Sequence, residues 1–130
     1  MNIKNFTTVL SKNAQTFYAF GGRDYGVDSV QTIMLSTDTG NTWSIVRDVT
    51  GQWLKDAFFI NTNIGFAVGG NGTIIKTTDG GTNWNTVNSP IHNREFNSVY
   101  FINSTTGFIA GGNFAEFDTL NSVRTILKTT

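Results

Sequence analysis

The chain contains no cysteine and only one histidine among its 130 residues. The lack of cysteine excludes disulfides, cysteine-based zinc sites and thiol chemistry, and the lone His92 cannot form a multi-histidine metal site. Charge is also scarce, because charged residues make up 14% of the chain and nine basic residues balance nine acidic ones. The composition therefore offers neither the basic stripe that nucleic acid requires nor a polybasic patch for anionic lipids.

Long hydrophobic runs are missing as well. No apolar stretch approaches the roughly 18 residues of a membrane helix, and no segment of useful length has helical periodicity. The first five residues lack the apolar core of a signal peptide, so we expect either a protein that stays inside the cell or a mature fragment with an added Met. The chain has 14 glycines, 11 phenylalanines and one proline, a composition that favours a single domain of tight-turned β structure.

The chain repeats itself. Residues 6–22 (FTTVLSKNAQTFYAFGG), 54–70 (LKDAFFINTNIGFAVGG) and 96–112 (FNSVYFINSTTGFIAGG) align without gaps, with spacings of 48 and then 42 residues. A period in the forties is the size of a four-stranded β-propeller blade. In the second unit, the pattern predicts strands at residues 57–60, 65–68, 73–77 and 84–87, which we letter A to D from the inner strand outward. Asn71-Gly72 predicts a tight turn before strand C. Strands A and B are almost continuously apolar, which is typical of inner strands that are covered on both faces.

Two of the expected C–D turns carry the same motif, [S/T]-x-D-x-G-x-x-W. The shared positions are Ser36, Asp38, Gly40 and Trp43 in the first copy and Thr77, Asp79, Gly81 and Trp84 in the second. The carboxylate can accept backbone N–H bonds inside the turn, and the hydroxyl can anchor the base of the hairpin. The glycines permit positive φ, and each tryptophan is expected to be buried against a neighbouring blade. These aspartates favour a turn-stabilising role over metal binding, because neither copy has the spacing of an EF-hand.

The motif and the stretch 65–84 (GFAVGGNGTIIKTTDGGTNW) resemble Asp-box, or BNR-like, repeat propellers, and most closely the photosystem II assembly-factor-like repeats of secreted bacterial proteins. The resemblance covers nearly the whole chain. It implies an all-β fold and favours an extracellular or cell-surface location. It does not imply one activity, because the same box occurs in sialidases, other glycoside hydrolases, sorting receptors and adhesins.

The predicted fold is therefore an arc of a β-propeller made of antiparallel four-stranded blades. We place blade 1 at about 6–47, blade 2 at about 54–88 and blade 3 at about 96–130, the third without its outer strand. Fewer than three complete blades cannot close a ring, and an open arc exposes blade faces and a strand edge. We therefore expect either a longer parent chain or self-association, for example a dimer that forms a six-bladed ring.

Candidate ligand-binding residues lie in the connections opposite the Asp-boxes. The B–C loops 23–29 and 113–123 and the D–A linkers 49–53 and 88–95 should share one face of the propeller. The chemistry-bearing residues expected there are Arg23, Asp24, Tyr25, Asp28, Trp53, Arg94, Glu95, Glu116 and Asp118. The plain alternative is that they are solvated loop residues, and Trp53 could either stack on a sugar or plug the central channel.

Three functions are compatible with these features, and none requires a cofactor. The first is a non-catalytic scaffold that presents loops to a protein or a glycan. The second is a fragment of a sialidase-like glycoside hydrolase, although the chain has four arginines and no Arg-Ile-Pro motif, and no spacing singles out a pair of catalytic carboxylates. The third is a photosystem-type assembly factor, for which we would expect a basic patch that the balanced charge does not supply.

Overall fold

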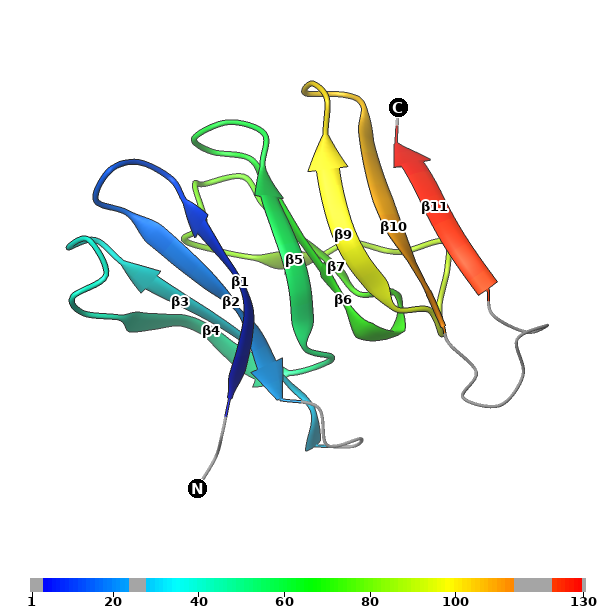
Figure 1. The fold of residues 1–130 in the computed structure, drawn as a ribbon, viewed down its shortest axis with the longest axis horizontal. Coiled ribbons are helices and arrows are strands. Elements are labelled where there is room, and N and C mark those ends of the chain that lie inside the picture. Colours follow the sequence, from blue (N-terminus) through cyan, green and yellow to red (C-terminus); the bar gives the residue numbers. More distant parts are fainter. Residues whose placement is uncertain (1–3, 24–27, 114–122, 130) are drawn as a thin grey trace.

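The computed structural model describes residues 4–23, 28–113 and 123–129, and these residues form three antiparallel sheets (Figure 1). Between β6 (Gly65–Gly69) and β7 (Ile74–Thr77) they include a single 3-10 turn, η2 (Gly70–Gly72). None of the described helical structure is long and apolar enough to cross a membrane. The all-β prediction is therefore confirmed.

Each sheet is a meander whose strands pair in the order of the sequence. The first sheet consists of β1 (Asn5–Ser11), β2 (Phe17–Arg23), β3 (Val30–Ser36) and β4 (Ser44–Thr50). The second consists of β5 (Leu54–Phe59), β6 (Gly65–Gly69), β7 (Ile74–Thr77) and β8 (Asn85–Thr86). The third contains β9 (Phe96–Phe101), β10 (Gly107–Asn113) and β11 (Val123–Thr129), so in the described residues it lacks the outer strand that the other two possess.

The turn predicted at Asn71-Gly72 is η2, between β6 and β7. Asn71 has φ of 52° and Gly72 has φ of 72°, both in the left-handed region. A Cβ at Gly72 would also lie 2.1 Å from the carbonyl oxygen of Ile91. Glycine is therefore required here both by the backbone angle and by the close approach of the 88–95 linker.

The inner strand of every sheet carries a bulge at the same repeat position. The register shifts around Thr7 in β1, around Lys55 in β5 and around Asn97 in β9. A bulge turns its extra side chain away from the regular alternation of the strand. Here the turned side chains reach the next sheet: the Thr7 hydroxyl donates to the Leu54 carbonyl at 2.7 Å, and Lys55 Nζ donates to Asn97 Oδ1 at 3.0 Å.

The sheets stack like blades, with β1, β5 and β9 side by side along the inner edge of the arc (Figure 1). Two apolar clusters fill the spaces between neighbouring sheets. One gathers around Trp84 between the first and second sheets, and the other gathers around Phe96 and Phe101 between the second and third. The core therefore lies between blades, as the continuous apolar character of the inner strands predicts.

The two ends of the arc leave apolar faces open. Val9 on the first sheet is 57% exposed, whereas its repeat equivalent Ala57 on the second is 3% exposed. On the outward side of the third sheet Ile126 is 76% exposed, whereas its equivalent Ile74 is 7% exposed. The difference follows from stacking, since only the faces between two described sheets are covered.

Stacking also corrects one expectation. Both box tryptophans were expected to be buried, and Trp84 is, at 6% exposure, but Trp43 is 37% exposed. Trp84 packs on the preceding sheet through an edge contact with Phe20 at 5.5 Å between ring centroids. Trp43 faces the side of the first sheet on which no described sheet packs, so the same motif gives a half-exposed ring.

Candidate functional site

The two Asp-box turns have nearly identical hydrogen bonds. Asp79 Oδ1 accepts the Thr77 hydroxyl at 2.8 Å and the Asn83 backbone N–H at 2.9 Å, and its Oδ2 accepts the Asn83 amide at 2.7 Å. Asp38 accepts the Thr42 N–H at 2.9 Å and the Thr42 hydroxyl at 2.6 Å. These bonds favour the ionised carboxylates, led by the backbone N–H of Asn83 for Asp79 and by the hydroxyl of Thr42 for Asp38, and they lower the pKa of each aspartate to about 2.

The hydroxyl and glycine positions complete each turn. The Thr77 hydroxyl accepts the Gly81 N–H at 2.8 Å, and the Ser36 hydroxyl accepts the Gly40 N–H at 2.9 Å. Both glycines have positive φ, 94° at Gly81 and 86° at Gly40. The polar groups of the box are thus used within the turn, which leaves the carboxylates poorly placed to bind a ligand.

The second turn is also held by the first sheet. Trp84 packs between Phe20 and Phe59. Its backbone carbonyl accepts a hydrogen bond from Arg47 Nη1 at 2.9 Å. Burial lowers the pKa of Arg47 below its ordinary value. The Tyr18 hydroxyl donates to the Gly80 carbonyl at 2.8 Å, and burial, followed by the charge of Asp79, raises the pKa of Tyr18. This box therefore links two blades as well as closing its own hairpin.

The candidate ligand-binding face lies at the opposite end of the sheets from these turns. The end of β2, the start of β3, the end of β10 and the start of β11 are together at the lower end of the view in Figure 1, with the linkers that lead into β5 and β9. Of the residues expected on this face, the structure describes Arg23, Asp28, Trp53, Arg94 and Glu95. Four others, Asp24, Tyr25, Glu116 and Asp118, lie outside the described residues.

Trp53 and Glu95 are brought together by a residue that the sequence analysis missed. Lys55 Nζ lies 2.7 Å from Glu95 Oε2 and 5.5 Å from the centroid of the Trp53 ring. Glu95 Oε1 also accepts the Asn71 backbone N–H at 3.4 Å. Lys55 belongs to β5 but precedes residues 57–60, the predicted strand A, and the inner-strand bulge turns it toward the loop face. No sequence signal marks that bulge.

The two arginines of this face are held by backbone carbonyls. Arg94 Nη1 donates to its neighbour Asn93 at 3.0 Å, and Arg23 Nη2 donates to the Asp28 carbonyl at 3.2 Å. Trp53 lies against the base of the first B–C loop, because a Cβ at Gly22 would be 3.2 Å from its Cα. The loop face thus combines a half-buried indole with cationic groups over two neighbouring blades.

Within the described ranges, no group of three or more His, Cys, Asp or Glu side chains could hold a metal ion.

Stacked four-stranded meanders with two Asp-box turns define the class of protein as an Asp-box β-propeller. A comparison with protein families is more specific. Residues 34–114, well over half of the chain, match the family model described as photosynthesis system II assembly factor YCF48. The chain belongs to this family, and the resemblance inferred from the repeats is confirmed.

Two known proteins illustrate the relationship. A 49-residue stretch is 45% identical to the photosystem II assembly lipoprotein Ycf48 of Trichormus variabilis, covering 37% of this chain and 14% of that protein. The fold superimposes on the solved structure of YCF48 bound to a D1 peptide with a TM-score of 0.68 and 19% identity, covering 97% of this chain and 36% of that one. The chain therefore spans only a minor part of the length of both relatives.

These comparisons bear on the three functions derived from the sequence. They support a protein-binding scaffold and favour the assembly-factor alternative, and they give no support to glycan binding. The balanced net charge does not weigh against the assembly-factor alternative, because net charge describes the whole chain and a binding surface depends on a few local groups.

Proposed function

We propose that this chain is a protein-binding module of the assembly-factor kind, which holds an extended segment of a photosystem II subunit such as D1. Its family membership over residues 34–114 carries the proposal. A solved relative of the same fold was captured with a D1 peptide, which supports a peptide as the ligand. Propellers suit this task because rigid blades hold loops from several repeats on one face.

The loop face has the chemistry that a peptide segment needs. A half-buried Trp53 ring offers apolar area at low entropic cost, and aromatic and arginine side chains dominate binding energy in protein interfaces. Arg94 can exchange its bond to the Asn93 carbonyl for a carboxylate or carbonyl of the ligand. The Lys55–Glu95 pair fixes the wall beside the indole, so little of this surface must reorganise when a ligand binds.

The proposal is tested by titrating a fluorescently labelled D1 peptide with the chain and measuring anisotropy. We expect saturable binding that Trp53→Ala weakens at least about tenfold, as for an aromatic interface anchor. Trp43→Ala is the matched control, because Trp43 is also partly exposed but lies in an Asp-box turn at the other end of the sheets. Binding is expected to survive this substitution.

Two outcomes would contradict the proposal, and a third would contradict the placement of the ligand on the loop face. One is the absence of D1 peptide binding by a folded chain. The other is retention of the chain on a glycan array together with no affinity for the peptide, which would restore the glycan alternative. Equal losses in Trp53→Ala and Trp43→Ala would show that the ligand does not use the loop face.

We also propose that one open face of the arc binds the opposite open face of a second copy of the chain. Phe6 and Val9 are exposed on one face, and Tyr100 and Ile126 are exposed on the other. In the interior of the arc, surfaces at the equivalent repeat positions pack against each other between the sheets. A head-to-tail contact of this kind is heterologous, so it leads to a ring if its rotation closes.

Light scattering coupled to size exclusion measures this association. We expect a concentration-dependent increase in mass that Ile126→Gln reduces and Val49→Gln on β4 does not, since Val49 is also exposed but lies outside both faces. A wild-type chain that remains monomeric at high concentration would refute self-association. It would leave the peptide-binding proposal untouched, because the two proposals rest on different surfaces.

A further inference from the structure

Asn71-Gly72 is the one place in the chain where a glycine directly follows an asparagine. This dipeptide is chemically labile, because the backbone nitrogen of the glycine can attack the side-chain carbonyl carbon of the asparagine. A glycine favours the attack, since it has no side chain to shield its nitrogen. Asn71 is also exposed in the turn η2, so water can reach it. The turn is therefore a candidate site for deamidation.

The reaction has two steps, and water is its only co-reactant. A bond forms between the Gly72 nitrogen and Cγ of Asn71, while the Cγ–Nδ2 bond breaks and the amide leaves as ammonia with the proton of the Gly72 N–H. Water then opens the resulting succinimide ring at either of its carbonyls. One product is aspartate. The other is isoaspartate, in which the main chain runs through the side chain and gains a methylene group.

In the folded chain the backbone angles of Asn71 oppose the first step. The five-membered ring closes only when the Gly72 nitrogen is eclipsed with Cβ of Asn71. At φ of 52° and ψ of 38°, that nitrogen instead points to the opposite side of the Cα–C bond from Cβ. Ring closure therefore requires the turn to leave its left-handed conformation.

The 88–95 linker opposes the reaction a second time, because it holds both reacting groups. The Gly72 N–H donates to the Arg94 carbonyl at 2.6 Å, and Asn71 Oδ1 accepts the Asn93 N–H at 3.1 Å. The Asn71 N–H donates to Glu95 Oε1 at 3.4 Å. The turn is thus bonded to three consecutive residues of the linker, and it cannot rearrange while these bonds are kept.

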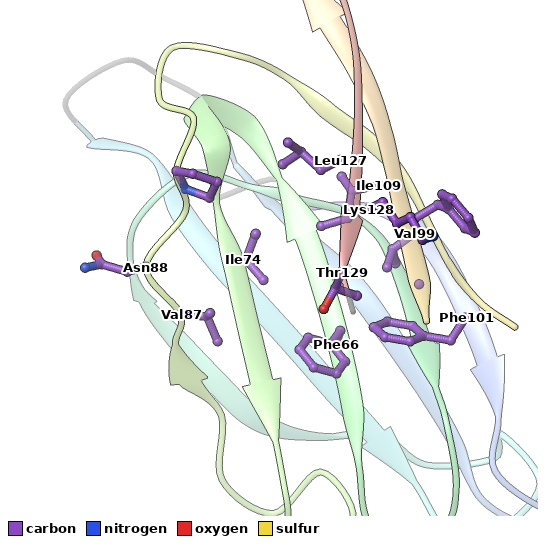
Figure 2. A pocket seen from close by; sticks show the side chains of 13 residues that line it. Phe66, Ile74, Val87, Asn88, Val99, Phe101, Ile109, Leu127, Lys128 and Thr129 are labelled. Atoms are coloured by element: carbon purple, nitrogen blue, oxygen red, sulfur yellow. The ribbon is translucent and has the colours of Figure 1, made fainter. Parts of the chain in front are cut away.

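The linker is itself fixed near its start and in its middle. Val87, the residue before it, donates its N–H to the Ile74 carbonyl at 2.9 Å, and both residues line the cavity between the second and third sheets (Figure 2). The Ser89 hydroxyl donates to the Ile91 carbonyl at 2.7 Å and accepts the Ile91 N–H at 3.1 Å. The Ile91 carbonyl in turn packs directly on Gly72. Release of the linker and loss of the turn are therefore expected to occur together.

We propose that Asn71 is a deamidation site whose reaction is gated by opening of the 88–95 linker. While the linker is docked, the two reacting groups are held apart, and only the open fraction of the chain reacts. The isoaspartate product cannot restore the turn, because its extra methylene group does not fit between the linker and Gly72. Modification therefore leaves the linker undocked, and with it Arg94 and Glu95 of the candidate ligand-binding face. The proposal does not depend on peptide binding.

The rate of deamidation tests the gate. The whole chain is incubated at mildly alkaline pH, either folded or unfolded in guanidinium chloride, and the proteolytic fragment that contains residue 71 is followed by mass spectrometry. We expect Asn71 to react at least about tenfold more slowly in the folded chain, because local opening limits the reaction. A folded chain that reacts as fast as the unfolded one would overturn the proposal.

Two serines separate opening of the linker from unfolding of the whole chain. Ser89→Ala removes the hydroxyl that holds the middle of the linker, and it should speed deamidation of the folded chain about fivefold, as for one lost hydrogen bond. Ser11→Ala is the matched control. Its hydroxyl also donates to the carbonyl two residues further on, that of Asn13, at 2.9 Å, but it lies in the turn between β1 and β2. Equal acceleration by the two substitutions, or none by Ser89→Ala, would mean that the linker is not the gate.

Hydrogen exchange tests the consequence. The isoaspartate form is separated from the unmodified chain by chromatography, and the exchange of backbone amides is compared between the two. We expect faster exchange at Gly72 and Asn93, whose N–H groups donate between the turn and the linker, and unchanged exchange in the Asp-box turn 77–84. Full protection of both amides in the isoaspartate form would show that the linker stays docked, which would refute the proposed effect of the modification.

Discussion

Replacing Trp84 by alanine tests the physical basis of the fold, which is that blades are stable because they bury box tryptophans against each other. Trp84 is 6% exposed and meets Phe20 and Phe59 edge-on, at 5.5 and 5.9 Å between ring centroids. Truncating a buried aromatic ring of this kind costs about 3–5 kcal/mol, through lost transfer energy and the cavity left behind. We therefore expect Trp84→Ala to lower the free energy of unfolding by about that amount.

The matched control is Trp43→Ala, because it removes the same ring from the same motif. Trp43 Nε1 donates to Gly40, and Trp84 Nε1 donates to Gly81, each at 3.1 Å, so both variants lose the same local hydrogen bond. Trp43 is 37% exposed and lacks a described neighbouring sheet. Its loss should cost only about 1 kcal/mol or less, near the range of surface substitutions.

Urea unfolding followed by far-UV circular dichroism measures both values, provided that the slope with denaturant is unchanged between variants. If Trp84→Ala does not fold, Trp84→Phe retains part of the packing and keeps the comparison possible. Equal destabilisation by Trp84→Ala and Trp43→Ala would show that the tryptophan acts within its own hairpin. That result would refute the idea that it joins two blades.

Three further predictions concern the turns. The pKa of Asp38 and of Asp79 is lowered from an ordinary value near 3.8 to about 2. Their contribution to the free energy of unfolding is therefore complete above pH 4 and is lost as pH falls toward 2. The free energy of unfolding of Asp79→Asn should depend less on pH in this range than that of the original chain. Gly81→Ala should destabilise the chain more than Gly40→Ala. Both glycines have positive φ, but a Cβ at Gly81 would clash with the Tyr18 hydroxyl at 2.7 Å, whereas one at Gly40 would lie 4.0 Å from the Trp43 ring; equal thermal shifts would contradict this. Tyr18→Phe should cost about 1 kcal/mol in urea unfolding, and it should remove a phenol that ultraviolet titration shows ionising above the ordinary pKa of tyrosine.

The repeat allowed most of the fold to be predicted from sequence. Alignment of three segments gave the strands of the second sheet to within a few residues, since the predicted 65–68 and 73–77 correspond to β6 and β7. It also predicted a third sheet without its outer strand, as the described residues show. Periodicity succeeds here because each unit has to bury the same positions against a copy of itself, so local pattern and tertiary packing agree.

What the repeat could not give is the difference between equivalent positions. Trp43 and Trp84 have the same motif, yet their exposure differs because it depends on a neighbouring sheet that the motif does not encode. Lys55 was missed for a related reason. Its contact with Glu95 and Trp53 depends on a bulge that turns an inner-strand residue toward the loop face, and glycines or other local markers of that bulge are absent from the sequence at that point.

The same reasoning shows where apolar surface stays uncovered in such a stack of blades. Between the described sheets, apolar positions of neighbouring blades pack against each other in two clusters. Where the series of described blades stops, the equivalent positions are open, as Val9 and Ile126 show on the two outer faces. Ile126→Gln tests this, because it changes an outer face and leaves the clusters between the sheets intact. The free energy of unfolding should change by no more than about 0.5 kcal/mol, the range of surface substitutions. A loss as large as the one expected for Trp84→Ala would mean that the position is covered after all, and exposure would not follow from the stacking of sheets.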